Sequence, residues 1–304
     1  MTKDFTWNTA VTLSHNKNSV KKLTGEEVQL WEAKFGYDQK THIIGVDRPL
    51  GQMYGYVTDG LYQVSDFDYD AATKTYTLKD GVPYMGKKKD VKPGMWKFKN
   101  VDGSEDCKIT EGDKTVIGNA YPKFYGGINN TFTYKDFDLS IFLTYSFGND
   151  VLNATKLTNT KTALQNRNVL DVANSSNRWV VVNQAGELIT DPEEMAAINQ
   201  GKNFAAVYDN EVGDTYIHSW AVEDGSYLKL SNITLGYTFP KKVLNKIGIS
   251  KLRLYATGSN LLTWTKYSGF DPEVSTMGNG LTPGVDFGAY PKSRSFVFGI
   301  NLAF

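Results

Sequence analysis

The amino-acid sequence predicts an all-β fold: an antiparallel transmembrane β-barrel fragment of about six strands from a larger barrel, with long extracellular loops. Three observations support this prediction. Segments of alternating apolar and polar residues recur along the chain, the connections between them are short and long in turn, and the last segment ends on an aromatic residue, Phe304. Alternation with a period of two gives a strand two different faces.

Composition narrows the class of protein. Among 304 residues, 33 basic and 33 acidic side chains leave no net charge, which argues against a nucleic-acid partner. The single cysteine, Cys107, excludes an intrachain disulfide and a site built from several thiolates. No stretch approaches the ~20 consecutive apolar residues of a membrane helix. The mean hydropathy of −0.39 is still compatible with membrane strands, because alternating strands have a mildly polar average.

Several ranges alternate, and we expect each to form a strand that pairs with the next. These ranges are 4–14, 124–134, 137–147, 227–239, 251–263 and 294–304. Each is about as long as the ~9–11 residues that cross an outer membrane at a tilt. In 227–239 the apolar phase changes near Ser231, which indicates a β-bulge or the point where the strand leaves the bilayer.

The connections differ in length at the two ends of these strands. Residues 135–136 and 240–250 make short turns, whereas 15–123, 148–226 and 264–293 are long. Short periplasmic turns and long extracellular loops are typical of outer-membrane barrels.

Loops of this length must contain structure of their own. Thr24 precedes two acidic residues in a capping-box pattern, which predicts a helix from there to about Lys34. Asp191 followed by Pro192 and an acidic first turn predicts a second helix.

The two faces of the strands predict where lipid and the barrel interior lie. We expect one set of apolar side chains to face lipid with no cover from the rest of the chain: Leu139, Ile141, Leu143, Phe296, Phe298 and Ile300. The opposite set should face the barrel interior: Asn129, Thr131, Ser140, Thr144 and Asn301. The sheet should be open, with strands 4–14 and 294–304 as its edges.

Several sequence segments carry a resemblance to a known family, and they occur in that family's order. They are 51–60 (GQMYGYVTDG), 92–110 (from KPG to KIT), 117–127 (IGNAYPKFYGG), 130–139 (NTFTYKDFDL), 224–230 (DGSYLKL), 235–240 (LGYTFP), 258–262 (GSNLL), 267–273 (YSGFDPE) and 298–304 (FGINLAF). Together they cover most of the chain apart from the middle of 148–226. In these segments and their order the chain closely resembles the C-terminal part of the SusC/RagA family of TonB-dependent outer-membrane transporters.

The resemblance implies a barrel of the 22-strand type in the outer membrane of a Gram-negative, Bacteroidetes-type bacterium. Such transporters import oligosaccharides or peptides, with a SusD-like surface lipoprotein as lid and the TonB complex as energy source. The sequence begins MTKDFTW, without the charged and apolar regions of a signal peptide, and we expect residues 1–304 to lack both this peptide and the plug domain of the family. We therefore expect residues 1–304 to be a C-terminal barrel segment that does not transport alone, because the smallest natural barrels have ~8 strands.

One other class of protein is compatible with the strand pattern. Half-buried strands of a soluble β-sandwich alternate in the same way, so the chain would then be a stand-alone secreted or surface β-rich protein that binds glycans. An enzyme is not predicted. The acidic residues Asp209, Glu211 and Asp214 are a weak basis for a glycosidase pair in a chain with 33 carboxylates.

One segment carries a degenerate metal-binding pattern. Four oxygen-bearing residues occupy positions 1, 3, 5 and 12 of an EF-hand-like loop: Asp102, Ser104, Asp106 and Asp113. Such spacing lets short oxygen ligands converge on Ca²⁺, but Cys107 stands where the motif has its glycine. A solvated acidic turn is the competing interpretation. Apart from this Ca²⁺ hypothesis no cofactor is predicted.

Histidines and aromatic residues are the remaining candidates for metal-binding, membrane-interface or sugar-binding residues. We expect His15, His42 and His218 to be surface or loop residues, because none forms a ligand-spaced pair. Aromatic residues at the short-turn end fit a periplasmic girdle: Tyr134, Phe137, Tyr237, Phe239 and Phe304. Those in or beside the long loops would either stack on sugars or pack the loops: Trp179, Trp220, Trp264 and Tyr267.

Overall fold

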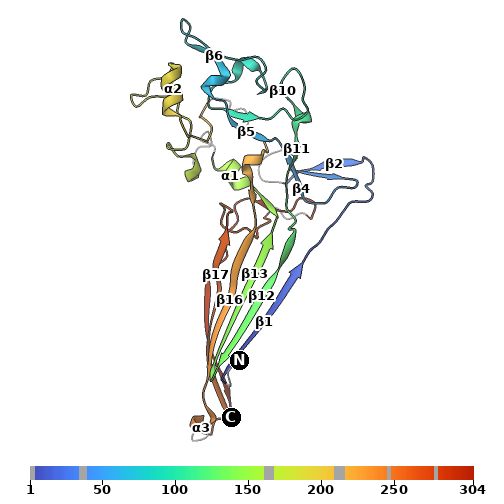
Figure 1. The fold of residues 1–304 in the computed structure, drawn as a ribbon, viewed down its shortest axis with the longest axis vertical. Helices are drawn as coiled ribbons and strands as arrows, with labels where there is room; N and C mark the ends of the chain where they lie inside the picture. Colours follow the sequence, from blue (N-terminus) through green and yellow to red (C-terminus); the bar gives the residue numbers. More distant parts are fainter. Residues whose placement is uncertain (1–3, 34–39, 161–167, 209–215, 245–247, 277–279) are drawn as a thin grey trace.

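A computed structural model describes residues 4–33, 40–160, 168–208, 216–244, 248–276 and 280–304. Its main feature is one long antiparallel sheet of 6 strands in the order β1-β12-β13-β16-β17-β19. The strands are β1 (Phe5–Ser14), β12 (Phe124–Tyr134), β13 (Phe137–Phe147), β16 (Tyr227–Thr238), β17 (Lys251–Thr265) and β19 (Ser295–Ala303). The long connections gather at one end of this sheet, and both chain termini lie at the other (Figure 1).

The strand predictions are confirmed. Every strand begins and ends within two residues of its predicted range, and each pairs with its predicted neighbour. Among the described residues β1 and β19 each have only one partner in this sheet, so the sheet is open with the predicted edges.

The register places like residues in rows across the strands. One row is apolar from edge to edge: Trp7, Phe132, Leu139, Leu235, Ala256 and Phe298. The adjacent row, on the other face, is largely polar: Asn8, Thr131, Ser140, Thr234, Thr257 and Val297. Alternation in each strand is therefore converted by the pairing into one apolar face and one polar face.

The predicted irregularity near Ser231 is a β-bulge. Phe142 pairs with Asn232 and Leu143 with Leu230, so Ser231 has no opposite residue in β13. The extra residue shifts the alternation by one position, which puts Leu230 and Ile233 on the same face. Without it, the two halves of β16 would present apolar side chains to opposite sides.

No second layer of the described chain covers the apolar face. Phe296, Phe298 and Ile300 are 66%, 80% and 68% exposed. Leu139, Ile141 and Leu143 are half-buried, and none of them belongs to the buried set. The three clusters of buried hydrophobic residues found in the described chain contain no residue of the six long strands. A β-sandwich, which would bury this face against a second sheet, is therefore excluded.

The long connections form a separate body above the sheet. The first contains the four-stranded sheet β11-β4-β3-β2 and three two-stranded pairs, β5 with β9, β6 with β7, and β8 with β10. Their bounds are β2 (Val28–Trp31), β3 (His42–Gly45), β4 (Gln52–Gly55), β5 (Thr58–Leu61), η1 (Val64–Asp66), β6 (Phe67–Asp70), β7 (Thr75–Leu78), β8 (Tyr84–Met85), η2 (Lys88–Asp90), β9 (Trp96–Phe98), β10 (Lys108–Ile109), η3 (Glu111–Asp113) and β11 (Thr115–Asn119).

The other two long connections complete this body. The second contains β14 (Asp150–Asn153), α1 (Ala154–Thr158), η4 (Asp171–Ala173), α2 (Pro192–Ile198), η5 (Ser219–Ala221) and β15 (Val222–Asp224). The third contains β18 (Val285–Asp286), which joins β14 and β15 in one sheet. One buried cluster includes Met53, Leu152 and Val285, and so draws on all three connections.

Of the two helices predicted in the long connections, one is present and one is not. The helix from Thr24 is wrong: Gly25 has φ 93°, and Val28–Trp31 is strand β2, paired with β3. Pairing with β3 outweighs the local capping signal. The helix at Asp191 is confirmed as α2, in which the Asp191 side chain accepts a hydrogen bond from the Glu194 backbone N–H. In the described ranges no helix is both long and apolar enough to span a bilayer.

The two faces predict unequal tolerance to charge. We expect Ile141→Arg to destabilise the assembled barrel by ~2–4 kcal/mol, because it places a guanidinium in hydrocarbon, and Thr144→Arg to cost much less. Equilibrium unfolding of the assembled protein in lipid vesicles measures both. Equal costs at the two positions would contradict the assignment of the faces.

Candidate functional site: the polar face and the loop network above it

The polar face carries hydrogen-bonded pairs that link neighbouring strands. Thr144 Oγ1 and Ser231 Oγ lie 2.7 Å apart, and Thr234 Oγ1 and Thr257 Oγ1 lie 2.9 Å apart. The Ser259 hydroxyl donates to Asn232 Oδ1 at 2.7 Å. These hydroxyl and amide groups are uncharged and can exchange hydrogen bonds with water or a polar solute. The face is suited to line an aqueous path.

A charged pair lies at the short-turn end of this face. Arg253 on β17 donates from Nε and Nη2 to the two carboxylate oxygens of Asp138 on β13, at 2.9 and 2.5 Å. The side chains meet across the intervening strand β16 at Gly236. A Cβ there would lie 2.4 Å from Arg253 Nη2 and 2.5 Å from Asp138 Oδ1, so only glycine leaves room for the pair.

A second charged group lies where the sheet meets the third connection. Lys229 on β16 is 4% exposed, and its Nζ lies 2.6 Å from Glu273 Oε2. Lys292 Nζ contacts the same oxygen at 2.5 Å, and the Tyr227 hydroxyl donates to Glu273 Oε1 at 2.7 Å. Burial alone would raise the pKa of Glu273, but these donors outweigh it and lower the pKa to about 2. Glu273 thus fastens the third connection to the top of the sheet.

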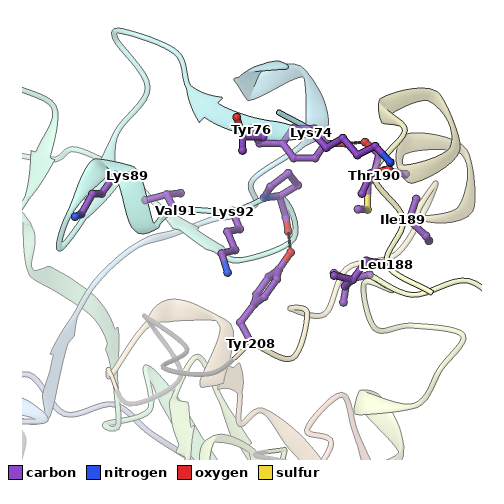
Figure 2. A pocket seen from close by; sticks show the side chains of 13 residues that line it. Lys74, Tyr76, Lys89, Val91, Lys92, Leu188, Ile189, Thr190 and Tyr208 are labelled. Atoms are coloured by element: carbon purple, nitrogen blue, oxygen red, sulfur yellow. Dashed lines mark hydrogen bonds between the residues drawn. The ribbon is translucent and has the colours of Figure 1, made fainter. Parts of the chain in front are cut away.

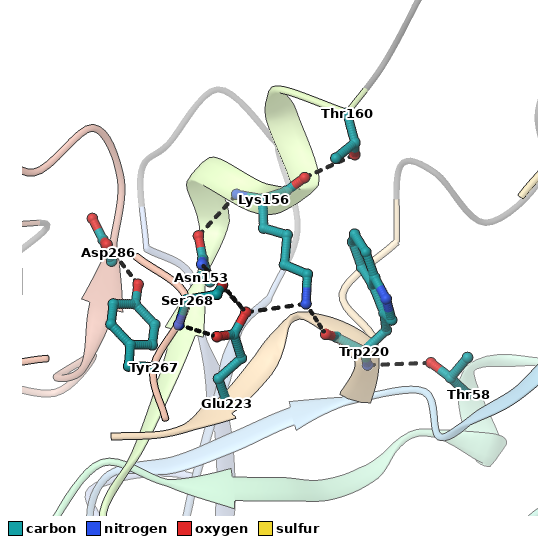
Figure 3. A network of polar contacts seen from close by, with 9 residues as sticks. All are labelled: Thr58, Asn153, Lys156, Thr160, Trp220, Glu223, Tyr267, Ser268 and Asp286. Atoms are coloured by element: carbon teal, nitrogen blue, oxygen red, sulfur yellow. Dashed lines mark hydrogen bonds and ion pairs between the residues drawn. The ribbon is translucent and has the colours of Figure 1, made fainter. Parts of the chain in front are cut away.

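A larger network lies above this point, around Glu223 on β15 (Figure 3). Glu223 accepts hydrogen bonds from the backbone N–H and the hydroxyl of Ser268, both at 2.8 Å, and pairs with Lys156 Nζ at 3.0 Å. Burial alone would raise the pKa of Glu223, but these donors outweigh burial and lower the pKa below its usual value. The Lys156 ammonium also donates to the Trp220 carbonyl and lies 4.1 Å from the Trp220 ring centroid.

The network joins the second and third connections, and each of its carboxylates accepts hydrogen bonds from neighbouring residues. In the same region the Tyr267 hydroxyl donates to Asp286 Oδ2 at 2.5 Å. Glu223 has four donor contacts, because Asn153 Nδ2 lies 3.4 Å from Oε1 as well. A carboxylate held in this way positions loops and is poorly suited to proton transfer.

Three of the four candidate calcium ligands, the aspartates, act mainly as acceptors for nearby backbone N–H groups, whereas Ser104 Oγ lies 3.5 Å from Asn100 Nδ2. Asp102 accepts from Ser104 N at 2.8 Å, and Asp106 accepts from Lys108 N at 3.0 Å. That backbone bond is the main cause of the lowered pKa of Asp106. Asp113 is fully buried and accepts from Val101 N at 2.8 Å and from Thr110 N at 2.7 Å.

The backbone of the 102–113 loop nonetheless shares one feature with an EF-hand loop. Cys107, at the glycine position, has φ 55°, the left-handed conformation for which glycine is favoured there. Across the described ranges no cluster of three or more His, Cys, Asp or Glu side chains could hold a metal ion. Calcium binding by Asp102, Ser104, Asp106 and Asp113 stays a prediction.

The histidines differ in burial: His15 is a surface residue, and the other two lie in the long connections, within the expectation of surface or loop positions. His15 is exposed, with Nδ1 2.7 Å from the Lys123 carbonyl oxygen. His42 and His218 lie in loop structure but are buried, and burial lowers their pKa to about 4 and about 3. Both are therefore neutral packing residues at physiological pH. Asp209, Glu211 and Asp214 lie outside the described residues.

The loop aromatics mostly pack. Trp179 and Tyr267 are buried, and Trp220 is half-buried against two of the hydrophobic clusters. Trp264 differs: it is exposed on β17, opposite Leu228, at the loop end of the apolar face. At the other end, Phe137 and Tyr237 rings pack with centroids 4.7 Å apart, and Tyr237 and Phe239 with centroids 5.0 Å apart. Aromatic residues therefore flank the apolar band at both ends, as in membrane barrels.

Sequence reasoning missed the charged groups that organise the site. Three of these charged residues lie inside predicted strand ranges on the polar face: Asp138, Lys229 and Arg253. A charge within a membrane strand could have identified them as candidate site residues. No feature of the sequence identified Glu223 and Lys156, because these residues are far apart in sequence and lie in irregular connections.

An open sheet with one uncovered apolar face and one polar face defines a segment of a transmembrane β-barrel, and comparisons with known proteins agree. No family model matches the chain. TonB-dependent receptor P3 of Formosa agariphila is 32% identical over 309 residues, which covers 99% of this chain and 27% of the relative. TonB-dependent receptor SusC of Bacteroides thetaiotaomicron is 27% identical over 306 residues, which covers 100% of this chain and 25% of the relative.

Solved structures show the same fold. The chain superposes on the RagAB peptide transporter with a TM-score of 0.63 at 18% identity, over 100% of this chain and 28% of that one. The RagAB peptide importer in its open-open state gives a TM-score of 0.62. The chain thus spans about a quarter of the length of the curated relatives it matches. Over nearly its whole length the chain is therefore similar to part of these TonB-dependent receptors, and it shares the fold of the corresponding part of the RagAB structures.

The pKa of Glu273 predicts an acid-sensitive attachment of the third connection. Because this pKa falls from its ordinary 4.5 to about 2, the ionised carboxylate stabilises the fold above about pH 4.5. The stabilisation is lost as the pH falls from there toward 2. We expect hydrogen exchange in 268–276, corrected for intrinsic rates, to rise at pH 3 relative to pH 7. Glu273→Gln should exchange fast at both pH values, whereas Glu105→Gln, an exposed control, should match the wild type. A wild-type rate independent of pH would contradict this role.

The backbone bonds of Asp113 predict a structural role for its carboxylate. Asparagine has only one acceptor oxygen, so Asp113→Asn leaves a buried backbone donor without a partner, at a cost of about 1–3 kcal/mol. We expect faster amide exchange at Val101 and Thr110 in this variant. The exposed Asp106→Asn serves as the matched control and should change less. If millimolar calcium instead slowed exchange in the wild type and not in Asp113→Asn, the calcium hypothesis would replace this interpretation.

Proposed function

We propose that this chain forms part of the wall and extracellular loops of a TonB-dependent outer-membrane transporter that imports oligosaccharides. The observation that carries the proposal is the sheet with an uncovered apolar face and a hydrogen-bonded polar face. An apolar band of this kind is stable against lipid and would aggregate in water. Transport, and not catalysis, is the activity that this geometry supports.

The choice of an oligosaccharide rests on the chemistry of the polar face. Its central part offers hydroxyl and amide groups, and the charged pair of Asp138 and Arg253 lies toward one end. Such a surface suits a neutral solute rich in hydroxyl groups. A peptide is the alternative substrate, supported by the structural likeness to the RagAB peptide transporter.

The open edges of the sheet and the names of the relatives both indicate which partners the chain requires. Unpaired strand edges are not tolerated in hydrocarbon, so β1 and β19 require further strands, and the chain alone should not transport. We place the long connections at the cell surface, where a SusD-like lipoprotein would cover them. The TonB complex would supply energy from the periplasmic side, and the names of the relatives, TonB-dependent receptors, support its participation.

Two neighbouring residues on opposite faces test the proposal. We expect Thr234→Trp to narrow the interior and to lower uptake severalfold, because Thr234 lies on the polar face. Ile233→Trp, on the apolar face, is the matched control and should leave uptake near the wild-type level.

The assay is uptake of labelled neutral oligosaccharides and peptides by cells whose only copy of the receptor is the variant. Surface abundance is measured in parallel with an antibody. Import that persists without TonB, or that responds equally to both variants, would overturn the proposal. Import of peptides alone would overturn the choice of oligosaccharides.

A further inference from the structure

The body formed by the long connections contains a cavity of about 390 Å³ (Figure 2). It lies between β7, the segment that follows η2, and the residues that lead into α2. Its volume is in the range of pockets that hold small organic ligands. It is distinct from the polar face, because none of its lining residues belongs to the six long strands.

The walls of the cavity are apolar and aromatic, and they are fixed in place. Val91, Ile189 and Met195 contribute apolar surface. The Tyr208 hydroxyl donates to the Pro93 carbonyl at 2.7 Å, and the Tyr76 hydroxyl donates to the Thr190 carbonyl at 3.2 Å. These bonds tie neighbouring segments together. The Tyr76 ring also packs against Tyr69, with centroids 4.9 Å apart, and the remaining surface of both tyrosine rings lines the space. Such rings can stack on the apolar faces of sugar units.

The charged residues that line the cavity are all cations: Lys74, Lys89 and Lys92. Within the described ranges none of the three forms an ion pair, whereas the neighbouring Lys88 pairs with Asp80. Lys92 Nζ lies 5.0 Å from the Tyr208 ring centroid. Figure 2 shows Lys74 and Lys89 on opposite sides of the group of lining residues.

The acidic residue that caps α2 lies outside the lining of the cavity, although its charge acts on the lining residue Tyr76. Asp191 caps the helix by accepting the Glu194 backbone N–H at 2.9 Å, and it is not among the lining residues. The lysines therefore give the cavity a positive potential that its own lining does not neutralise. A ligand with one negative group could reach one side only, whereas a ligand with several could meet cations on both.

We propose that this cavity binds an acidic oligosaccharide, with carboxylate or sulfate groups at the lysines and sugar rings against the tyrosines. The site lies outside the proposed transport path, and its access to such a ligand depends on the proposed surface location of the connections. It would hold an anionic glycan at the cell surface, separately from the solute that crosses the barrel.

The test measures binding and not uptake, so its outcome is independent of whether the receptor imports a given solute. The full-length receptor that carries this chain, in detergent, is titrated calorimetrically with tri-galacturonate, neutral maltotriose and triglutamate. We expect tri-galacturonate to bind, with an affinity that falls as salt is raised, and maltotriose not to bind at this cavity. Absence of tri-galacturonate binding would overturn the proposal, and so would tighter binding of triglutamate.

Substitutions place the binding at the cavity. The combined variant Lys74→Gln, Lys89→Gln and Lys92→Gln should bind tri-galacturonate about tenfold more weakly, because three partly exposed contacts each contribute modestly. These exposed side chains can be replaced without disturbing a core, and near-ultraviolet circular dichroism checks the fold. Lys241→Gln, on α3 (Lys241–Leu244) at the opposite end of the molecule, is the matched control and should bind normally. Equal affinity of the combined variant and the control would assign the binding elsewhere and refute the site.

Discussion

The rest of the structure depends on one constraint: a backbone polar group in hydrocarbon must have a hydrogen-bond partner within the protein. A sheet meets this requirement in its interior, where each strand has two neighbours, and fails it at an open edge. β1 and β19 are such edges in the described chain. Lipid imposes a second requirement: a strand must keep one apolar side over its whole length, because polar side chains are costly in hydrocarbon. The bulge at Ser231 serves this end, because it restores the apolar phase of β16 and leaves both flanking strands paired.

A sheet that gives its apolar face to lipid cannot use that face to hold its connections. The connections must therefore form cores of their own, and the buried clusters lie entirely outside the six long strands. They are fastened to one another and to the sheet by polar contacts at the boundary. Glu223 links the second and third connections, and Glu273 links the third to β16. Both are carboxylates whose burial is offset by several donors, which makes each attachment specific and dependent on charge.

Sequence was sufficient for the long sheet and insufficient for the connections, and the reason is physical. The alternation that identifies 137–147 or 294–304 is itself the consequence of two different surroundings, so each strand carries its own signal. The bulge could be predicted for the same reason. Strand β2 could not, because Val28–Trp31 is held by pairing with His42–Gly45, whereas Thr24 offered a local helix signal. The carboxylate contacts of Glu223 and Glu273 were beyond prediction, since they depend on how distant irregular segments meet.

The distribution of charge distinguishes the two surfaces on which this segment could meet solutes. On the polar face, the pair of Arg253 with Asp138 and the pair of Lys229 with Glu273 are both neutralised by close contact. Between them the hydroxyl and amide groups satisfy one another across strands. Between these two pairs a solute on this face would meet many weak, exchangeable hydrogen bonds, which suits movement better than retention. The cavity above has the opposite character, with cations that its own lining does not neutralise and rings fixed by their hydroxyl bonds. Uncompensated charge beside an apolar wall favours retention of a ligand, which is why we propose passage and capture for different parts of the chain.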